Sequence, residues 1–197
     1  MTDQLARLVL IAGFIAVMPI GVYYRLRART DEKLDRREEG WFILLTLRPL
    51  AIACMLGQIA FLINPAWMEW SSVPLPGWLR WSGVVLGVAT AGLFIWTFHS
   101  LGRNLTDTVV TRREATLVTR GPYRIVRHPF YVAFFAAVTA NALVTANWYL
   151  AVTGLTAFAT IVLRTSTEEA KLLERFGRDY REYMQRTGRF FPRIVHR

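Results

Sequence analysis

Apolar residues gather in five long stretches of this 197-residue chain, and charged residues fill most of the connections between them. The stretches are residues 5–24, 41–63, 79–100, 130–146 and 148–163. A helix needs about 20 mainly apolar residues to cross a bilayer, with about 17 as the usual lower limit. The first three stretches meet this requirement, while the last two are short and join at Asn147 as a tight helical hairpin would. The pattern predicts an all-α polytopic membrane protein with about five transmembrane helices.

Beyond the fifth stretch, apolar residues recur at helical spacing, which predicts an amphipathic C-terminal helix. Such a helix lies on the membrane surface or packs as a lid. Its periodic positions are Leu172, Phe176, Tyr180 and Tyr183. Thr165 and Ser166 each precede a glutamate by three residues, which fits a capping box at the start of this helix. Gly177 lies in its middle and marks a bend or a point of close approach.

The first stretch could also be interpreted as a signal peptide. It carries one charge, at Arg7, and no small-residue cleavage pattern precedes Arg25. Its apolar part is also longer than that of a signal peptide. We therefore expect residues 5–24 to be a retained helix within a single integral membrane domain, residues 1–197.

Positive charge is concentrated on one side of the predicted membrane. Of the 24 Lys and Arg residues, 21 fall in segments that five spans place together, namely Arg25–Arg37, Arg103–Arg127 and the tail from Arg164. The opposite connections, residues 64–78 and Asn147, contain none. The positive-inside rule therefore predicts that the N-terminus lies outside and the C-terminus in the cytoplasm. Topology and anionic membrane lipids account for the net charge of +10, so we expect no nucleic-acid partner.

Several common chemistries lack their sequence signatures. Cys54 is the single cysteine, and the three histidines are scattered at His99, His128 and His196. This spacing does not suit a metal site, and none is expected. The chain also lacks the nucleophile-elbow, dinucleotide-binding and P-loop motifs.

Polar residues crowd the start of the fourth stretch, in the segment Gly121–Tyr131, with the sequence GPYRIVRHPFY. Pro129 suits the first turn of a helix. Arg124, Arg127 and His128 precede or accompany this turn, where exposed backbone amides favour anions. Two interpretations stay open: the basic residues anchor the helix end at lipid head groups, or they form an anion pocket.

A pair of acids, Glu168 and Glu169, follows the fifth stretch on this otherwise basic side. The pair fits the capping box described above, but it could also bind a cationic ligand. Arg164 would share a helical face with Glu168 if the helix continues. Arg48 lies about 10 Å into the second stretch. Its long side chain can extend to the membrane surface, which explains a charge at this depth.

These motifs resemble those of the isoprenylcysteine carboxyl methyltransferase family and of the related phospholipid methyltransferases. The resemblance covers about residues 100–192. Its motifs are Gly121-Pro122-Tyr123, Arg127-His128-Pro129-x-Tyr131, Glu168-Glu169 and Phe176-Gly177-x-x-Tyr180, preceded by Leu101-Gly102-x-Asn104 and Leu117-Val118-Thr119. The first two apolar stretches carry no motif of the family.

The resemblance implies a membrane methyltransferase that holds S-adenosyl-L-methionine at the cytoplasmic face. By analogy, Arg164 contacts the substrate and joins Glu168 as a catalytic residue. The implied cofactor-binding residues are Ala115, Thr116, Leu117, Val118, Tyr123, Arg127, His128, Pro129, Phe130, Tyr131, Glu168 and Glu169. The family often has histidine where this chain has Ala115, so a side-chain contact there is lost.

The chemistry of this cofactor agrees with the residue types. A glutamate suits its cationic portion, helix-end amides with arginine and histidine suit its carboxylate, and tyrosines can cover its sulfonium. Direct methyl transfer needs alignment and exclusion of water and no metal. The expected substrate is a lipophilic small molecule or a lipidated molecule whose carboxylate or other nucleophile accepts the methyl group. The 22 arginines against two lysines suggest a GC-rich microbial genome, hence a cytoplasmic membrane.

Two other functions stay open. A membrane reductase of the sterol reductase type would use NADPH in a related cofactor region, although this chain is short for that group. A non-catalytic membrane protein could also retain the fold, but we would then expect broken motifs.

Overall fold

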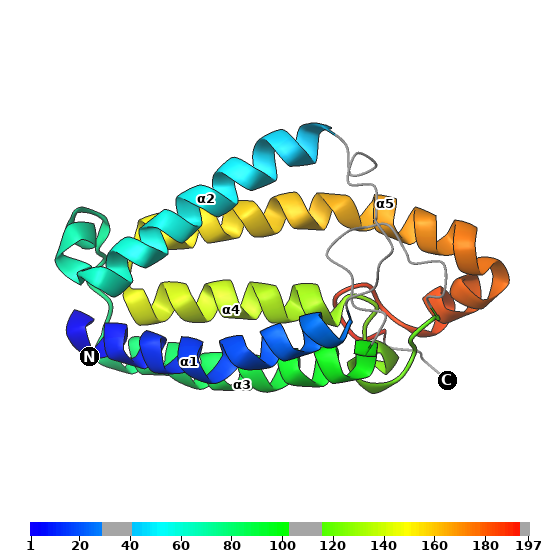
Figure 1. The fold of residues 1–197 in the computed structure, drawn as a ribbon, viewed down its shortest axis with the longest axis horizontal. Helices are drawn as coiled ribbons and strands as arrows, with labels where there is room; N and C mark the ends of the chain where they lie inside the picture. Colours follow the sequence, from blue (N-terminus) through cyan, green and yellow to red (C-terminus); the bar gives the residue numbers. More distant parts are fainter. Residues whose placement is uncertain (29–40, 103–115, 194–197) are drawn as a thin grey trace.

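The computed structural model describes residues 1–28, 41–102 and 116–193, and the side chains of residues 41–44 are not described. Its helices, including two short 3-10 helices labelled η, are α1 (Asp3–Arg27), α2 (Trp41–Ile63), η2 (Pro65–Ser71), α3 (Gly77–Leu101), η4 (Gly121–Arg124), α4 (Pro129–Thr145) and α5 (Trp148–Arg186) (Figure 1). No β-strand occurs in these described ranges. The prediction of an all-α fold is confirmed.

The five apolar stretches all form helices. By length and composition, α1, residues 45–63 of α2, α3 and α5 can each cross a membrane, whereas α4 is a shorter apolar helix of 17 residues. Most of their apolar surface faces outward, and only 6% of the apolar window of α1 is buried inside the protein. An integral, multi-pass membrane protein explains this surface, because lipid tails cover outward-facing apolar side chains.

Helix α5 differs from the prediction, because the fifth span and the C-terminal helix form one helix of 39 residues. The predicted capping box is wrong. The Thr165 hydroxyl donates to the Val162 carbonyl at 2.6 Å, and the Ser166 hydroxyl donates to the Leu163 carbonyl. Both hydroxyls bond back into a continuing helix, as serine and threonine do within helices. The break comes later, at Gly177, where φ is 50° and ψ is −116°.

Small residues let the helices approach closely, as is usual in membrane bundles. A Cβ atom on Gly83 of α3 would lie 2.7 Å from Leu143 Cβ of α4. A Cβ atom on Gly154 of α5 would lie 2.8 Å from a Val138 methyl group of α4. Glycine at both positions therefore fixes the spacing of the α3, α4 and α5 layers.

One end of the bundle is closed by polar contacts between its connections. The Asn147 side chain caps α5 and also donates to the Met68 carbonyl at 3.1 Å and to Ser71 Oγ at 2.8 Å. Arg80 donates to the Met1 carbonyl and to Asp3 Oδ1, both at 2.8 Å. These bonds hold η2, the α4–α5 turn and the start of α1 together.

Exposed tryptophans surround this closed end, which we call the tryptophan end. They are Trp67, Trp70, Trp78, Trp81 and Trp148. Tryptophan concentrates at membrane–water interfaces. Counted along α5 from Trp148, about 30 Å of helix, the thickness of a hydrocarbon core, ends near Glu168. The opposite end of the bundle, which carries η4 and residues 125–128 and 164–193, is therefore placed at the other interface. We call it the polar end.

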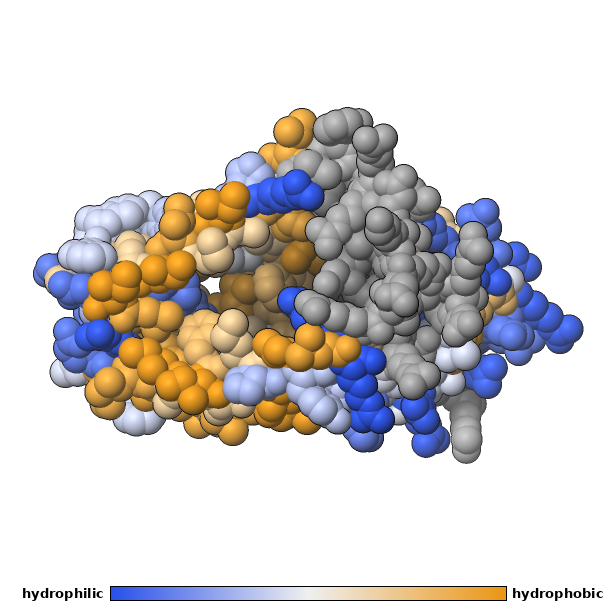
Figure 2. All heavy atoms as spheres, in the orientation of Figure 1, coloured by the Kyte–Doolittle hydropathy of each residue, from blue (hydrophilic) through white to orange (hydrophobic). Residues whose placement is uncertain are grey.

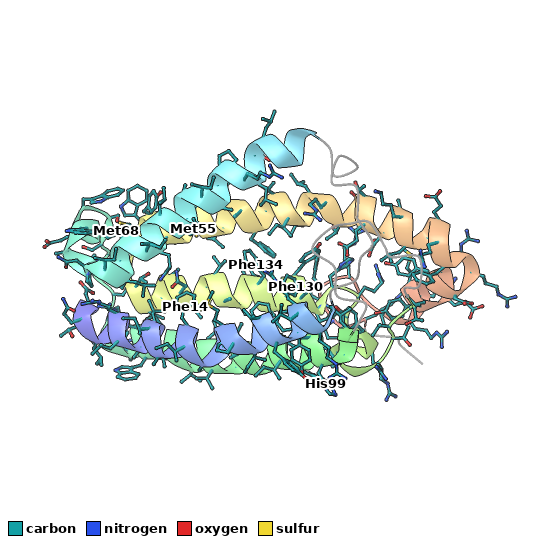
Figure 3. The ribbon with its side chains drawn as sticks, in the orientation of Figure 1. Phe14, Met55, Met68, His99, Phe130 and Phe134 are labelled. Carbon is teal, nitrogen blue, oxygen red and sulfur yellow. The ribbon has the colours of Figure 1, made fainter. Side chains whose placement is uncertain are left out.

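Helix α2 lies beside α5 and separates from α1 toward the polar end (Figure 1). Figure 2 shows a hollow on this face, bordered mainly by hydrophobic residues. Figure 3 labels Phe134 of α4, whose ring lies 6.3 Å from that of Phe158 of α5. Phe134 and Phe158 therefore pack between α4 and α5.

Candidate active site

The segment before α4 approaches the end of α3 closely at Gly121, where no side chain intervenes. Gly121 opens η4 with φ at +60°, a conformation that side-chain-bearing residues rarely adopt. A Cβ atom there would lie 2.1 Å from Ser100 Oγ of α3. Pro129 then starts α4 with a buried ring. The chain between these two residues carries Arg127 and His128 into the polar end.

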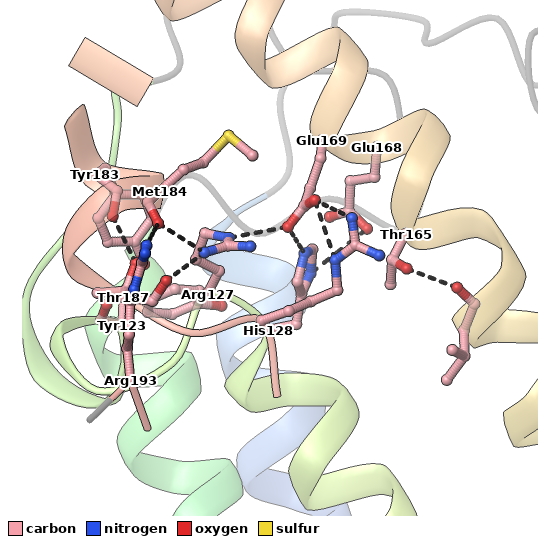
Figure 4. Close-up of polar contacts among 12 residues, drawn as sticks. Tyr123, Arg127, His128, Thr165, Glu168, Glu169, Tyr183, Met184, Thr187 and Arg193 are labelled. Atoms are coloured by element: carbon pink, nitrogen blue, oxygen red, sulfur yellow. Dashed lines mark hydrogen bonds and ion pairs between the residues drawn. The ribbon is translucent and has the colours of Figure 1, made fainter. Parts of the chain in front are cut away.

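Glu169 of α5 lies at the centre of a buried ion cluster (Figure 4). Its Oε1 accepts from Arg127 Nε at 2.9 Å and lies 3.2 Å from His128 Nε2, while its Oε2 accepts from the Arg189 guanidinium. The residue is 5% exposed. The anion and its cationic partners come from three separate segments, so the cluster joins α5, the start of α4 and the C-terminal segment.

The C-terminal segment, residues 187–193, packs along the residues before α4. The backbone amides of Arg127 and His128 donate to the carbonyls of Gly188 and Arg189 at 2.9 and 3.1 Å. The Arg127 guanidinium also donates to the carbonyls of Met184 and Thr187. Arg127 therefore satisfies helix-end carbonyls as well as pairing with Glu169.

The ionisation of Glu169 follows from these contacts. Burial by itself would raise the pKa of the Glu169 carboxyl. Hydrogen bonds from His128, Arg189 and Arg127 outweigh burial and hold this pKa far below its ordinary value. Glu169 lies beyond the apolar part of α5, and it remains an anion at any physiological pH.

Glu168 has different surroundings from its neighbour. The Tyr131 hydroxyl donates to Glu168 Oε2 at 2.6 Å, and His128 Nδ1 lies 3.9 Å from the same oxygen. The Glu168 side chain is 27% exposed, against 5% for Glu169. A carboxylate that is partly exposed in this way can bind a cationic ligand.

Aromatic rings flank the imidazole between the two acids. The rings of His128 and Tyr131 stack with centroids 5.3 Å apart and planes 6° apart. Phe190 of the C-terminal segment lies 5.8 Å from the His128 ring on a tilted plane. The stack fixes the imidazole, so that its two nitrogens face Glu168 and Glu169.

Two tyrosines reach the cluster because α5 bends at Gly177. Tyr180 and Tyr183 follow the bend and are both buried, with ring centroids 5.9 Å apart. The Tyr183 hydroxyl donates to the Tyr123 carbonyl at 2.6 Å (Figure 4). This bond attaches the last turns of α5 to η4.

The structure brings most of the predicted site residues to the polar end. Tyr123, Arg127, His128, Tyr131, Glu168 and Glu169 lie in the contacts above. Thr116, Leu117 and Val118 lie before η4 without regular secondary structure, and Ala115 lies outside the described residues. The Phe130 ring faces α3, 5.5 Å from the Phe94 ring. Arg164 is half-buried one helical turn before Glu168, and its charge acts on the Tyr131 hydroxyl.

Sequence reasoning missed the role of the C-terminal segment. Arg189 and Phe190 contact the site, but they carried no motif of their own in a tail that is rich in arginine. The Gly188 and Arg189 carbonyls also contribute, and a backbone carbonyl has no sequence signature. The spacing Phe176-Gly177-x-x-Tyr180 was the one available signal for this region.

Comparison with known proteins finds a family model that matches part of this chain. Residues 83–174 match the model of the isoprenylcysteine carboxyl methyltransferase family, which confirms the predicted resemblance. This match includes the start of α4, Arg164 and both glutamates. The tail beyond residue 174, with Tyr180 and Arg189, lies outside it.

Three similar proteins have names that point to different functions. A nickel-cobalt-cadmium resistance protein of Alcaligenes xylosoxydans xylosoxydans is 34% identical over 106 residues, 53% of this chain and 50% of that protein. Methanethiol S-methyltransferase 1 of Bradyrhizobium diazoefficiens is 34% identical over 110 residues, covering 53% and 37%. Protein-S-isoprenylcysteine O-methyltransferase B of Arabidopsis thaliana is 38% identical over 98 residues, covering 46% and 48%. The chain therefore spans half or less of the length of these relatives.

Proposed function

We propose that this chain is an integral membrane methyltransferase that uses S-adenosyl-L-methionine and methylates a lipophilic substrate. The observation that carries the proposal is the partly open carboxylate of Glu168, held by Tyr131 and beside His128 at the membrane boundary. In a chain similar to isoprenylcysteine carboxyl methyltransferases, this carboxylate suits the cationic part of the cofactor. The basic loops support a cytoplasmic location for the polar end, in a microbial inner membrane.

The residues of the polar end fit this cofactor. When bound, the cofactor supplies an electrophilic methyl group on a sulfonium. Glu168 provides the opposite charge, and the stacked rings of Tyr131 and His128 provide a flat aromatic surface for a cation. Arg127 and Glu169 hold His128 and the C-terminal segment in place around that surface. The segment Thr116–Val118 would supply backbone contacts.

The substrate is proposed to lie between the apolar hollow and Glu168. A lipophilic tail enters from the bilayer through the hollow in Figure 2 and keeps water away from the polar end. Arg164, one turn before Glu168 on α5, orients an acidic head group by paired hydrogen bonds. The chain's residues thus align the acceptor and exclude water, and no enzyme nucleophile takes part.

The names of the relatives guide the choice of test substrates. One is named an S-methyltransferase and another an O-methyltransferase, so the acceptor atoms to test are sulfur and oxygen. Transfer of a labelled methyl group to lipophilic thiols and to lipophilic carboxylates of matched tail length identifies the acceptor. If the Arg164 assignment is right, Arg164→Ala reduces transfer to carboxylates more than transfer to thiols.

Calorimetry of the detergent-solubilised protein tests the cofactor. We expect S-adenosylhomocysteine to bind and NADPH not to bind, and the reverse result would favour the reductase alternative. Glu168→Ala should weaken S-adenosylhomocysteine binding at least about tenfold, because charge-assisted hydrogen bonds are the strong ones. Glu182→Ala is the matched control, since Glu182 lies on the same helix but pairs on its surface with Arg178. Binding of neither nucleotide by the folded protein would favour a non-catalytic role.

A further inference from the structure

Tyr180 is the largest fully buried side chain of the described structure, with 1% of its surface exposed, and its hydroxyl has no hydrogen-bond partner among the described residues. Buried tyrosine hydroxyls are normally hydrogen-bonded, because burial removes the water that would otherwise bind them. An unpaired hydroxyl of this kind marks the place of a missing polar group. The Tyr180 hydroxyl therefore calls for a partner that residues 1–28, 41–102 and 116–193 do not supply.

Tyr183 provides an internal comparison. It lies on the same segment after the Gly177 bend, and its ring is 5.9 Å from the ring of Tyr180. Its hydroxyl is satisfied by the Tyr123 carbonyl at 2.6 Å. The part of α5 after Gly177 thus carries two buried tyrosines. The Tyr183 hydroxyl bonds to η4, and the Tyr180 hydroxyl bonds to none of the described residues.

The surroundings of the Tyr180 hydroxyl are those of the candidate cofactor site. The charges of Glu169, Arg127 and Glu168 all act on it. Neither acid accepts a hydrogen bond from it: both Glu169 oxygens bond to cationic side chains, and Glu168 Oε2 accepts from Tyr131. The hydroxyl therefore lies near enough to the ion cluster for the cluster's charges to act on it, but it makes no hydrogen bond to the described residues.

The Tyr180 hydroxyl is a donor at physiological pH. Burial raises the pKa of the Tyr180 phenol, and the negative charges of Glu169 and Glu168 raise it further. A phenol that keeps its proton beside two carboxylates requires an acceptor. Oxygen atoms of a ligand carboxylate or of ligand hydroxyls supply such acceptors.

We propose that Tyr180 is a cofactor-contacting residue, and that its hydroxyl donates a hydrogen bond to an oxygen of the bound S-adenosyl cofactor. This inference rests on the proposed function. The oxygen belongs to the amino-acid carboxylate or to the ribose, and both are acceptors of the same kind. The bend at Gly177 then has a functional consequence, because it brings Tyr180 to the ligand.

Two matched substitutions test the proposal, each removing one hydroxyl. We expect Tyr180→Phe to weaken S-adenosylhomocysteine binding about threefold to tenfold in calorimetry. Its unfolding temperature without ligand should stay unchanged or rise, because no protein hydrogen bond is lost. Tyr183→Phe should lower the unfolding temperature, because the Tyr123 carbonyl loses its donor.

A second ligand identifies the acceptor oxygen. Methylthioadenosine retains the ribose and lacks the amino-acid carboxylate. A loss of affinity for S-adenosylhomocysteine alone assigns the bond to the carboxylate, and a loss for both ligands assigns it to the ribose. Wild-type affinity for both ligands in Tyr180→Phe would overturn the proposal. An unfolding temperature that falls as far as in Tyr183→Phe would also overturn it, by showing a structural hydroxyl. In either case, binding by the wild-type protein would leave the proposed function intact.

Discussion

Arg127 Nε lies 2.9 Å from Glu169 Oε1, although 42 residues separate the two along the chain. The pair links the start of α4 to the middle of α5, and the same guanidinium reaches the carbonyls of Met184 and Thr187. Glu169 is thereby a structural anion, whereas its neighbour Glu168 keeps an edge of its carboxylate open. This division of roles between adjacent acids leads to the predictions that follow.

Neutralising Glu169 should mainly lower stability, whereas neutralising Glu168 should mainly weaken ligand binding. Glu169→Gln leaves the Arg127 charge buried without its anion, so we expect a loss of about 3–5 kcal/mol in stability, seen as a lower unfolding temperature in detergent. Glu168→Gln should leave the unfolding temperature nearly unchanged and weaken S-adenosylhomocysteine binding. Equal loss of stability in both variants would contradict the assignment of roles.

Acid should destabilise the wild-type protein through Glu169. The pKa of this carboxyl is lowered by folding, so its contribution is fully present above the ordinary pKa of 4.5 and is lost as the pH falls below that value. We expect the unfolding temperature to decline as the pH is lowered from 5 to about 3. The decline should be shallower in Glu169→Gln, and identical slopes would show that another group controls the acid transition.

The bend in α5 requires glycine. Gly177→Ala puts a Cβ atom on a backbone with φ of 50° and ψ of −116°, which costs about 1–3 kcal/mol, or it straightens the helix and displaces Tyr180 and Tyr183. We expect a lower unfolding temperature and weaker S-adenosylhomocysteine binding. Gly13→Ala is the control, because Gly13 lies in regular α1 helix with open space around it. That change should be neutral or slightly stabilising.

Arg189 should fasten the C-terminal segment and contribute less to global stability. Its side chain is 42% exposed, so Arg189→Ala removes one partly solvated ion pair while Arg127 still holds Glu169. We expect faster amide hydrogen exchange in residues 187–193 and a smaller decrease in unfolding temperature than in Glu169→Gln. Unchanged exchange in that segment would show that its backbone bonds to residues 127 and 128 suffice.

Much of the architecture was predictable because hydropathy is a local property. Each apolar stretch forms a helix, and the hairpin at Asn147 returns α5 to the end where α4 begins. That return places Glu168 near Tyr131, so the two halves of the candidate site could be expected to meet. The continuity of α5 through Thr165 was not predicted, because a threonine followed by a glutamate suits a helix interior as well as a cap.

The sequence by itself determined the number of apolar helices, the crowding of basic residues into the connections between them and the motifs that resemble a methyltransferase family. Only the tertiary structure decided which glutamate is buried, how residues 187–193 close the site and which tyrosine keeps an unpaired hydroxyl. The physical reason is that spans follow from the composition of continuous segments. The burial and hydrogen bonding of individual side chains instead depend on how residues 120–131 meet residues 164–193. Backbone carbonyls and the bend at Gly177 set that contact, and neither can be read from local composition.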